Sequence, residues 1–216
     1  MKTAKKAMLM TLCAIILVVA TVFGTMAYLT STDTVTNTFT VGNVAIKLDE
    51  AKVGTDGKAL TGADATRVKE NSYKLLPGHV YDKDPTVTVL AGSEESYVRM
   101  KVTFNNANEL DTIFAPDGAD LTSIFNGYDS TNWIAKGNTK DATANTRTYE
   151  FWYKEAVGAP TADVALDALF DSITVPGAIT KDQLAKLADF KITVVAEAIQ
   201  ADGFADAAEA WAAFST

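Results

Sequence analysis

The fold class of this chain of 216 residues is decided by one stretch, Tyr97-Val98-Arg99-Met100-Lys101-Val102-Thr103-Phe104. Apolar residues recur there at every second position, and basic residues or threonine stand between them. Successive side chains of a strand point to opposite faces, so the pattern predicts a strand with one buried and one solvated face. Turn-forming residues 91–95 precede it, and the strand expected at 85–90 is its predicted pairing partner.

Strand periodicity also extends over other parts of the chain. Further strands are predicted at 35–48 (with a bulge at Gly42-Asn43), 133–135, 147–154 and 190–200. Residues 54–72 are expected to form a long turn or an exposed loop. Helical spacing is confined to three short insertions, at about 121–125, 164–187 and 205–214. The sequence therefore predicts a mostly β fold, a jelly-roll-like antiparallel β-sandwich with short helical insertions and a C-terminal helix.

The N-terminus has the three-part layout of a secretory signal peptide. A basic start is followed by an apolar run over residues 7–23 and by small residues. Cleavage after Ala27 would place Thr25 and Ala27 at the −3 and −1 positions and make Tyr28 the first mature residue. The alternative is an uncleaved anchor, because the run is close to the shortest length that spans a membrane. In either case the rest of the chain is expected to work outside the cytoplasm, secreted or at the cell surface.

Charge and cysteine content narrow the functional class. The chain has 19 basic and 27 acidic residues, and loss of the three leader lysines would leave 16 against 27, a net charge of −11. Such an acidic surface argues against nucleic acid as a partner. The single cysteine, Cys13, lies in the leader, so the mature domain would have no disulfide and would depend on its own core.

No pattern of reactive residues indicates an enzyme or a cofactor. The chain has one histidine, His79, which follows the turn Pro77-Gly78, whereas zinc hydrolases need several histidine or acidic ligands at fixed spacing. Carboxylate pairs such as Glu94-Glu95 or Asp82 with Asp84 could serve acid–base work or bind calcium, but adjacent acids in a turn are expected to be solvated. Asp82-x-Asp84 and the acidic residues at 117–120 are too short to be a calcium loop. We therefore expect no catalytic, metal-binding or cofactor-binding residues.

Residues 28–37 are expected to form a mobile arm ahead of a single domain at 38–216. The arm is rich in threonine, contains one charged residue and lacks Pro and Gly, so its strand propensity is high. Once freed from the leader it could add to the sheet edge of a neighbouring molecule, with Leu29 and Val35 filling pockets. Such head-to-tail addition does not close and would give filaments. The alternatives are a first strand paired within its own domain or a disordered tail.

Four stretches together resemble the TasA/camelysin family of exported Gram-positive proteins: Gly24-Thr25-Met26-Ala27; Tyr28-Leu29-Thr30 leading into 37–44; Leu76-Pro77-Gly78 with 83–85 and 97–99; and 195–204 with the terminal helix. The resemblance implies a SipW-type signal peptide processed by its dedicated signal peptidase. It also implies a jelly-roll domain and a role as a subunit of biofilm matrix or cell-surface fibres. Self-association into filaments, matrix polysaccharide or an accessory matrix protein are the partners that it suggests. Residues 105–188 contribute little to the resemblance.

Two other functions remain open from the sequence. One is a secreted or membrane-tethered adhesion module that binds carbohydrate, because aromatic residues cluster at Trp133 and 149–153. Within that cluster Trp152 is predicted to lie on the opposite strand face from its neighbours, which are expected to fill the core. The other is a camelysin-like exported metalloprotease, for which the metal ligands are lacking. The apolar stripe of the terminal helix, Trp211 and Phe214 included, is expected to cover an open end or edge of the sandwich or to serve as a partner surface.

Overall fold

The computed structural model describes residues 3–6, 8, 10–15, 42–113 and 125–214. The chain forms two compact units, residues 1–41 and residues 42–216. In the first unit all the described residues are helical and Cys13 is exposed. No helix in the described part of the chain is long and apolar enough to cross a membrane. The expected cleavage site at Ala27 and Tyr28 and the arm with Leu29 and Val35 lie outside the described residues. So do residues 121–124 of the helical turn expected at 121–125, while Phe125 is described and is not helical.

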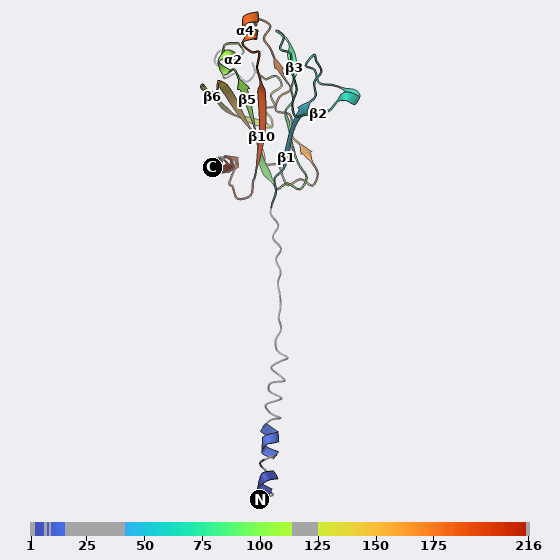
Figure 1. Cartoon of the computed structure of the whole chain (residues 1–216), viewed down its shortest axis with the longest axis vertical. Coiled ribbons are helices and arrows are strands. Elements are labelled where there is room, and N and C mark those ends of the chain that lie inside the picture. The colour runs from blue at the N-terminus through green and yellow to red at the C-terminus, as the bar shows by residue number, and fades with distance from the viewer. Residues whose placement is uncertain (1–2, 7, 9, 16–41, 114–124, 215–216) are drawn as a thin grey trace. The chain divides into compact units, whose positions relative to one another are not determined.

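The second unit is built mainly from antiparallel strands (Figure 1). One sheet has the order β2-β1-β4-β8, formed by β1 (Ile46–Ala51), β2 (Arg67–Val68), β4 (Thr86–Val89) and β8 (Val164–Ala165). The other has the order β10-β5-β7-β6, formed by β5 (Ser96–Asn105), β6 (Trp133–Asp141), β7 (Thr146–Tyr153) and β10 (Ile192–Gln200). A small third sheet joins β3 (Val80–Asp82) to β9 (Ser172–Thr174).

Helical segments are few and short. They are the 3₁₀ turn η1 (Gly62–Asp64), α2 (Ala107–Ile113), α4 (Lys181–Ala185) and α5 (Ala207–Phe214). Helix α4 begins with a capping box, in which Thr180 and Gln183 each bond to the other's backbone N–H. Helix α5 confirms the predicted C-terminal helix.

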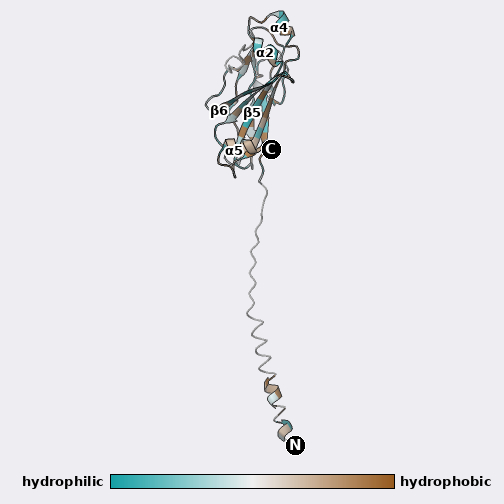
Figure 2. Cartoon of the chain, turned by 90° about the vertical axis from the view of Figure 1, so that its left-hand side faces the viewer, coloured by the Kyte–Doolittle hydropathy of each residue, from teal (hydrophilic) through white to brown (hydrophobic). Residues whose placement is uncertain are grey.

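The two four-stranded sheets share one core. Val87 and Val89 of β4 are fully buried against Val98 and Met100 of β5, and Phe151 of β7 belongs to the same cluster. Hydrophilic and hydrophobic residues alternate along β5 in Figure 2. The mostly β, antiparallel class with short helices is thereby confirmed, and two sheets facing across one core is the arrangement of a sandwich. The jelly-roll connectivity stays a prediction.

The predicted pairing of the strand at 97–104 with the strand at 85–90 is wrong. Strand β5 pairs with β10 and β7, whereas β4 pairs with β1 and β8. The chain after β4 crosses from one sheet to the other, so the apolar faces of β4 and β5 meet across the core. Strand periodicity identifies a buried face but does not distinguish a neighbour in the same sheet from one in the opposite sheet.

Three further expectations need correction. The helix expected over 164–187 is reduced to α4, because residues 164–165 are a strand and the backbone N–H groups of Leu166 and Leu169 bond to Val87 and Pro85. The predicted short strand at 133–135 is the first part of β6, which is nine residues long. The loop at 54–72 contains η1 and β2. Of the strand expected at 35–48, the described part begins only at Ile46.

Candidate functional site: a groove between two open sheet edges

Strands β1 and β10 each lack a full-length neighbour on one side among the described residues. Strand β10 pairs along its nine residues with β5, and no described strand lies on its other side. Strand β1 pairs with β4 from Ile46 to Asp49, but on its other side only Glu50 and Ala51 pair with β2. The strands β1 and β10 belong to different sheets and run side by side (Figure 1). Among the described residues, the sandwich therefore has main-chain groups of both sheets without a strand partner at one side.

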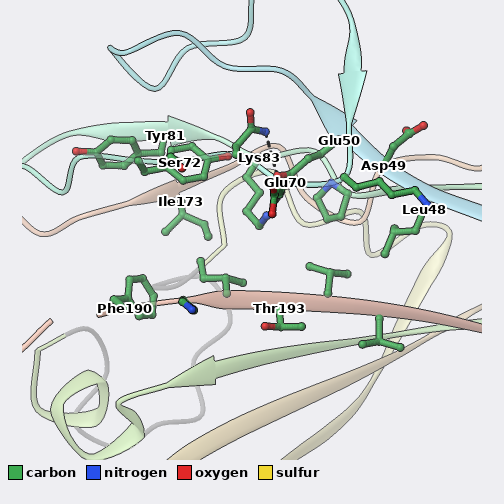
Figure 3. Close-up of a pocket in the computed structure, with 18 of the residues that line it drawn as sticks. Leu48, Asp49, Glu50, Glu70, Ser72, Tyr81, Lys83, Ile173, Phe190 and Thr193 are labelled. Carbon is green, nitrogen blue, oxygen red and sulfur yellow. Dashed lines mark hydrogen bonds and ion pairs between the residues drawn. The ribbon is translucent and has the colours of Figure 1, made fainter. Parts of the chain in front are cut away.

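A groove of about 1160 Å³ lies between these edges. Figure 3 shows Leu48, Glu50 and Tyr81 on one wall. The other wall is formed by Phe190, which precedes β10, and by β10 itself, where Thr193 is labelled. The apolar lining is provided by Ile46, Leu48, Tyr81, Ile173, Val175, Leu184, Leu187, Phe190, Ile192 and Val194. Several of these residues are only partly buried although they pack against the cores. The groove thus leaves apolar side chains of both sheets incompletely covered.

The opposite edge of the same sheet is protected, whereas the β10 edge is not. Strand β6 carries a register shift between Ala135 and Gly137, and Lys136 and Lys140 lie along it. Bulges and lysines are devices that prevent edge strands from pairing with other chains. Strand β10 has an unbroken register, and Ile192 and Val194 face inward while Val195 is 45% exposed on the other face. Its edge is therefore the one suited to accept another strand.

An ionic network that is partly buried lies at the wall of the groove formed by β1. Lys83 forms an ion pair with Glu50, and both side chains are 8% exposed. Arg67 binds Asp49 and also donates from Nη1 to Oδ2 of Asp84 at 2.8 Å. Burial alone would raise the pKa of Asp49, but hydrogen bonds from Arg67 and Lys47 outweigh it and lower that pKa. These bonds fix β1, β2 and the segment that follows β3 to one another.

Tyr73 lies at the same polar region. Burial, followed by the nearby negative charge of Glu50, raises the pKa of the Tyr73 phenol above its ordinary range. Its hydroxyl donates to the backbone oxygen of Asp82 at 3.0 Å. The phenol is therefore a protonated structural donor at neutral pH.

Sequence reasoning missed these groove residues. Arg67 and Asn71 lie in the segment expected to be an exposed loop, and Lys83 stands before a predicted strand. Glu50 was in no motif. The sequence signal that could have pointed to this network is the high density of charged residues between Asp49 and Asp84. Their spacing along the chain does not show which acidic residue pairs with which basic one.

The residues weighed for chemistry do not form a site. His79 lies in a loop, as predicted, and is exposed, with its ring 6.2 Å from that of Tyr81. Asp82 is paired with Lys58 and Asp84 with Arg67, so neither carboxylate is simply solvated as expected. Within the described ranges, no group of three or more His, Cys, Asp or Glu side chains could hold a metal ion.

The aromatic cluster divides between the two faces of its sheet, as predicted. Trp133, Tyr149 and Phe151 are buried in the core, whereas Trp152 lies on the outer face. The ammonium group of Lys136 lies 4.0 Å from the ring centre of Trp152. One face of this ring is therefore occupied by a cation.

The terminal helix packs on this outer face and also contacts the edge strand β10. The Trp211 ring is 3% exposed and its centre is 6.3 Å from that of Trp152, while Phe214 remains 43% exposed. The apolar stripe is thus used mainly for packing within the domain.

Comparison with protein-family models, with curated proteins and with solved structures finds no match to this chain.

Proposed function

We propose that this chain is an exported, non-catalytic structural subunit of extracellular matrix or cell-surface fibres, of the TasA/camelysin type. In the proposed assembly, the arm at 28–37 of one molecule adds as a strand to the groove between β1 and β10 of the next. The open edge of β10 is the observation that carries this proposal.

The arm matches this groove in length and in chemistry. At about 3.3 Å per residue, ten residues span about 33 Å, close to the length of the nine-residue β10. Main-chain groups of the arm would satisfy the unpaired edge, and Leu29 and Val35 would lie on the same face of the added strand. Its only charged residue, Asp33, is acidic, and the groove is lined by the exposed Lys191 and by Lys47, which is paired with Asp49.

The proposed contact is heterologous, because the donor arm and the acceptor groove are different surfaces of the chain. Each added molecule leaves one arm and one groove unused, so growth continues as a filament and does not stop at a dimer. Cleavage of the leader by a signal peptidase after Ala27 would release the arm and so couple assembly to export.

The experiment compares the purified mature protein beginning at Tyr28 with a form that carries extra residues before Tyr28 and with a form that lacks residues 28–36. Electron microscopy should show ordered filaments only for the authentic N-terminus. Filaments of equal abundance from the protein lacking 28–36 would contradict the strand-addition mechanism. The second outcome to record is binding of soluble polysaccharide, read from tryptophan fluorescence, although Lys136 above Trp152 gives the carbohydrate alternative less support.

A further inference from the structure

An amine, a carboxylate and a carboxamide meet at one point beside the groove. The ammonium group of Lys83 contacts Oε2 of Glu50, and Nδ2 of Asn71 donates to Oε1 of the same carboxylate at 3.0 Å. The three residues come from separate segments: Glu50 from β1, Asn71 from the loop after β2, and Lys83 from the residue that follows β3. Figure 3 shows Lys83 and Glu50 directed at each other. The buried carboxylate of Glu50 therefore contacts both Nζ of Lys83 and Nδ2 of Asn71. In an amide exchange, Nζ would replace Nδ2 on the side-chain carbonyl carbon of Asn71.

The orientation of the Asn71 amide is determined by its surroundings. Its Oδ1 accepts from the backbone N–H of Val53 at 3.0 Å, and its Nδ2 also donates to the backbone oxygen of Ala51 at 2.8 Å. The Val53 group can only donate and the Ala51 oxygen can only accept, so the opposite orientation would break both bonds. The carbonyl of Asn71 is thus polarised by one N–H donor, and its amino group lies against Glu50.

We propose that Lys83 and Asn71 become joined by an intramolecular isopeptide bond, with Glu50 as the acid–base group. One proton passes from the Lys83 ammonium to Glu50, which leaves a neutral amine as the nucleophile. The Nζ lone pair attacks Cγ of Asn71, and the negative charge that develops on Oδ1 is stabilised by the Val53 N–H. Glu50 returns that proton to Nδ2 as the Cγ–Nδ2 bond breaks, and it then accepts the second proton that Nζ loses on becoming an amide nitrogen, so that Glu50 ends protonated. The products are one Nζ–Cγ amide and one ammonia molecule, with no oxidant or other reactant required.

Burial favours this step. Lys83 and Glu50 are 8% and 6% exposed, and charged groups removed from water are costly unless they are paired or neutralised. Formation of the amide removes the buried positive charge permanently.

The bond would serve a domain that has no cysteine outside its leader. It would close the segment from 71 to 83, which contains the turn at Pro77-Gly78 and β3, into a covalent loop along one wall of the groove. Such a cross-link restricts the unfolded chain as a disulfide does. It is independent of whether the arm enters the groove.

The test is mass spectrometry of the purified protein. The intact mass should be lower than the sequence mass, for the N-terminus actually present, by one ammonia molecule. Trypsin should fail to cleave after Lys83, so a fragment of residues 70–74 should be found joined to a fragment of residues 75–99. Fragmentation of that species should place the link between Asn71 and Lys83.

Variants separate this bond from a cyclic imide at Asn71, which has the same mass change. Lys83→Arg keeps the charge and Glu50→Gln keeps the shape, and both should restore the full sequence mass. The matched control Lys58→Arg alters a lysine that is paired with Asp82 but half exposed, and should retain the mass loss. A wild-type protein of full sequence mass with free fragments 70–74 and 75–83 would overturn the proposal, as would a mass loss that persists in Lys83→Arg.

Discussion

The guanidinium carbon of Arg99 lies 4.3 Å from the centre of the Trp211 ring, and this contact joins α5 to the outer face of the sheet. The Arg99 side chain is only 5% exposed, and its Nε and Nη1 donate to Glu197 at 2.5 Å and Glu150 at 3.2 Å. A strand residue predicted to face water is therefore enclosed by a helix and two carboxylates. Cation–π contacts of this kind are strengthened when the cation is desolvated.

Replacement of Trp211 by alanine should detach α5 and destabilise the domain. The Trp211→Ala variant removes a buried ring and the nearer of the two aromatic rings over Arg99, the other being that of Phe214 at 5.2 Å, so we expect a loss of about 3–5 kcal/mol in the free energy of unfolding. Phe214→Ala is the control, because this ring is 43% exposed on the same helix. Urea denaturation measures both variants. An equal loss in the two would show that Trp211 has no special role.

The pair between Glu197 and Arg99 should make stability depend on pH in acid. Burial would raise the pKa of Glu197, but hydrogen bonds from Arg99 and Lys101 outweigh it and hold the pKa below its ordinary 4.5. Glu197 therefore binds a proton more readily in the unfolded state than in the folded state. Its stabilising contribution is complete above the ordinary pKa of 4.5 and is lost as the pH falls through the lower folded-state pKa.

The measurement is the free energy of unfolding at neutral pH and at about pH 3, for the natural protein and for Glu197→Gln. The natural protein should lose more stability in acid than the variant, because the glutamine cannot bind the proton. Other carboxylates titrate in both proteins and cancel in the comparison. Identical losses would exclude a contribution from Glu197.

A side chain added at Gly57 should lower the stability of the domain more than one added at Gly62. Both have positive φ, +76° and +65°, but a Cβ on Gly57 would lie 2.3 Å from Cδ1 of Tyr81, and one on Gly62 would meet nothing within 4 Å. Gly62→Ala should cost about 1–2 kcal/mol for the left-handed backbone alone. Gly57→Ala should cost about 1–3 kcal/mol more, because the buried Tyr81 ring must move. Thermal or urea unfolding of the two variants isolates the clash.

A lysine on the open edge should slow filament formation, if assembly uses β10. Val195 on β10 and Ile134 on β6 are 45% and 44% exposed on the outer face of one sheet, at its two opposite edges. A charge on an edge strand opposes the addition of another strand. Val195→Lys should therefore lengthen the lag of assembly, followed by light scattering and electron microscopy, while the matched Ile134→Lys should not. The same delay in both variants would point to net charge instead of the edge.

The parts of the fold that the sequence predicted correctly are those with strong local periodicity. The strands β5 and β10, the helix α5 and the outward position of Trp152 all follow from spacing over a few residues. Strand β6 was underestimated because eight of its nine residues are exposed or nearly so, and alternation is absent where neither face is buried. Residues 164–170 have helical spacing but are held as a strand and loop by backbone bonds to Val87 and Pro85, which no local pattern contains.

The groove and its ionic wall were beyond sequence reasoning for a related reason. Glu50 is separated in the chain from Asn71 by 21 residues and from Lys83 by 33, so nothing in their spacing indicates that they meet. The open edge of β10 could not be predicted either, because it depends on which distant strands pair with β10 and not on its own residues.

The sequence by itself determined which face of the clearly alternating strands packs on the core, that the class would be mostly β, and that the domain would have no disulfide, because these follow from local alternation and composition. Only the tertiary structure decided which strands are neighbours, which edges stay unpaired, and which buried charges meet. Partner choice depends on contacts between distant segments, and the same alternating pattern can satisfy a neighbour within its sheet or a facing strand across the core.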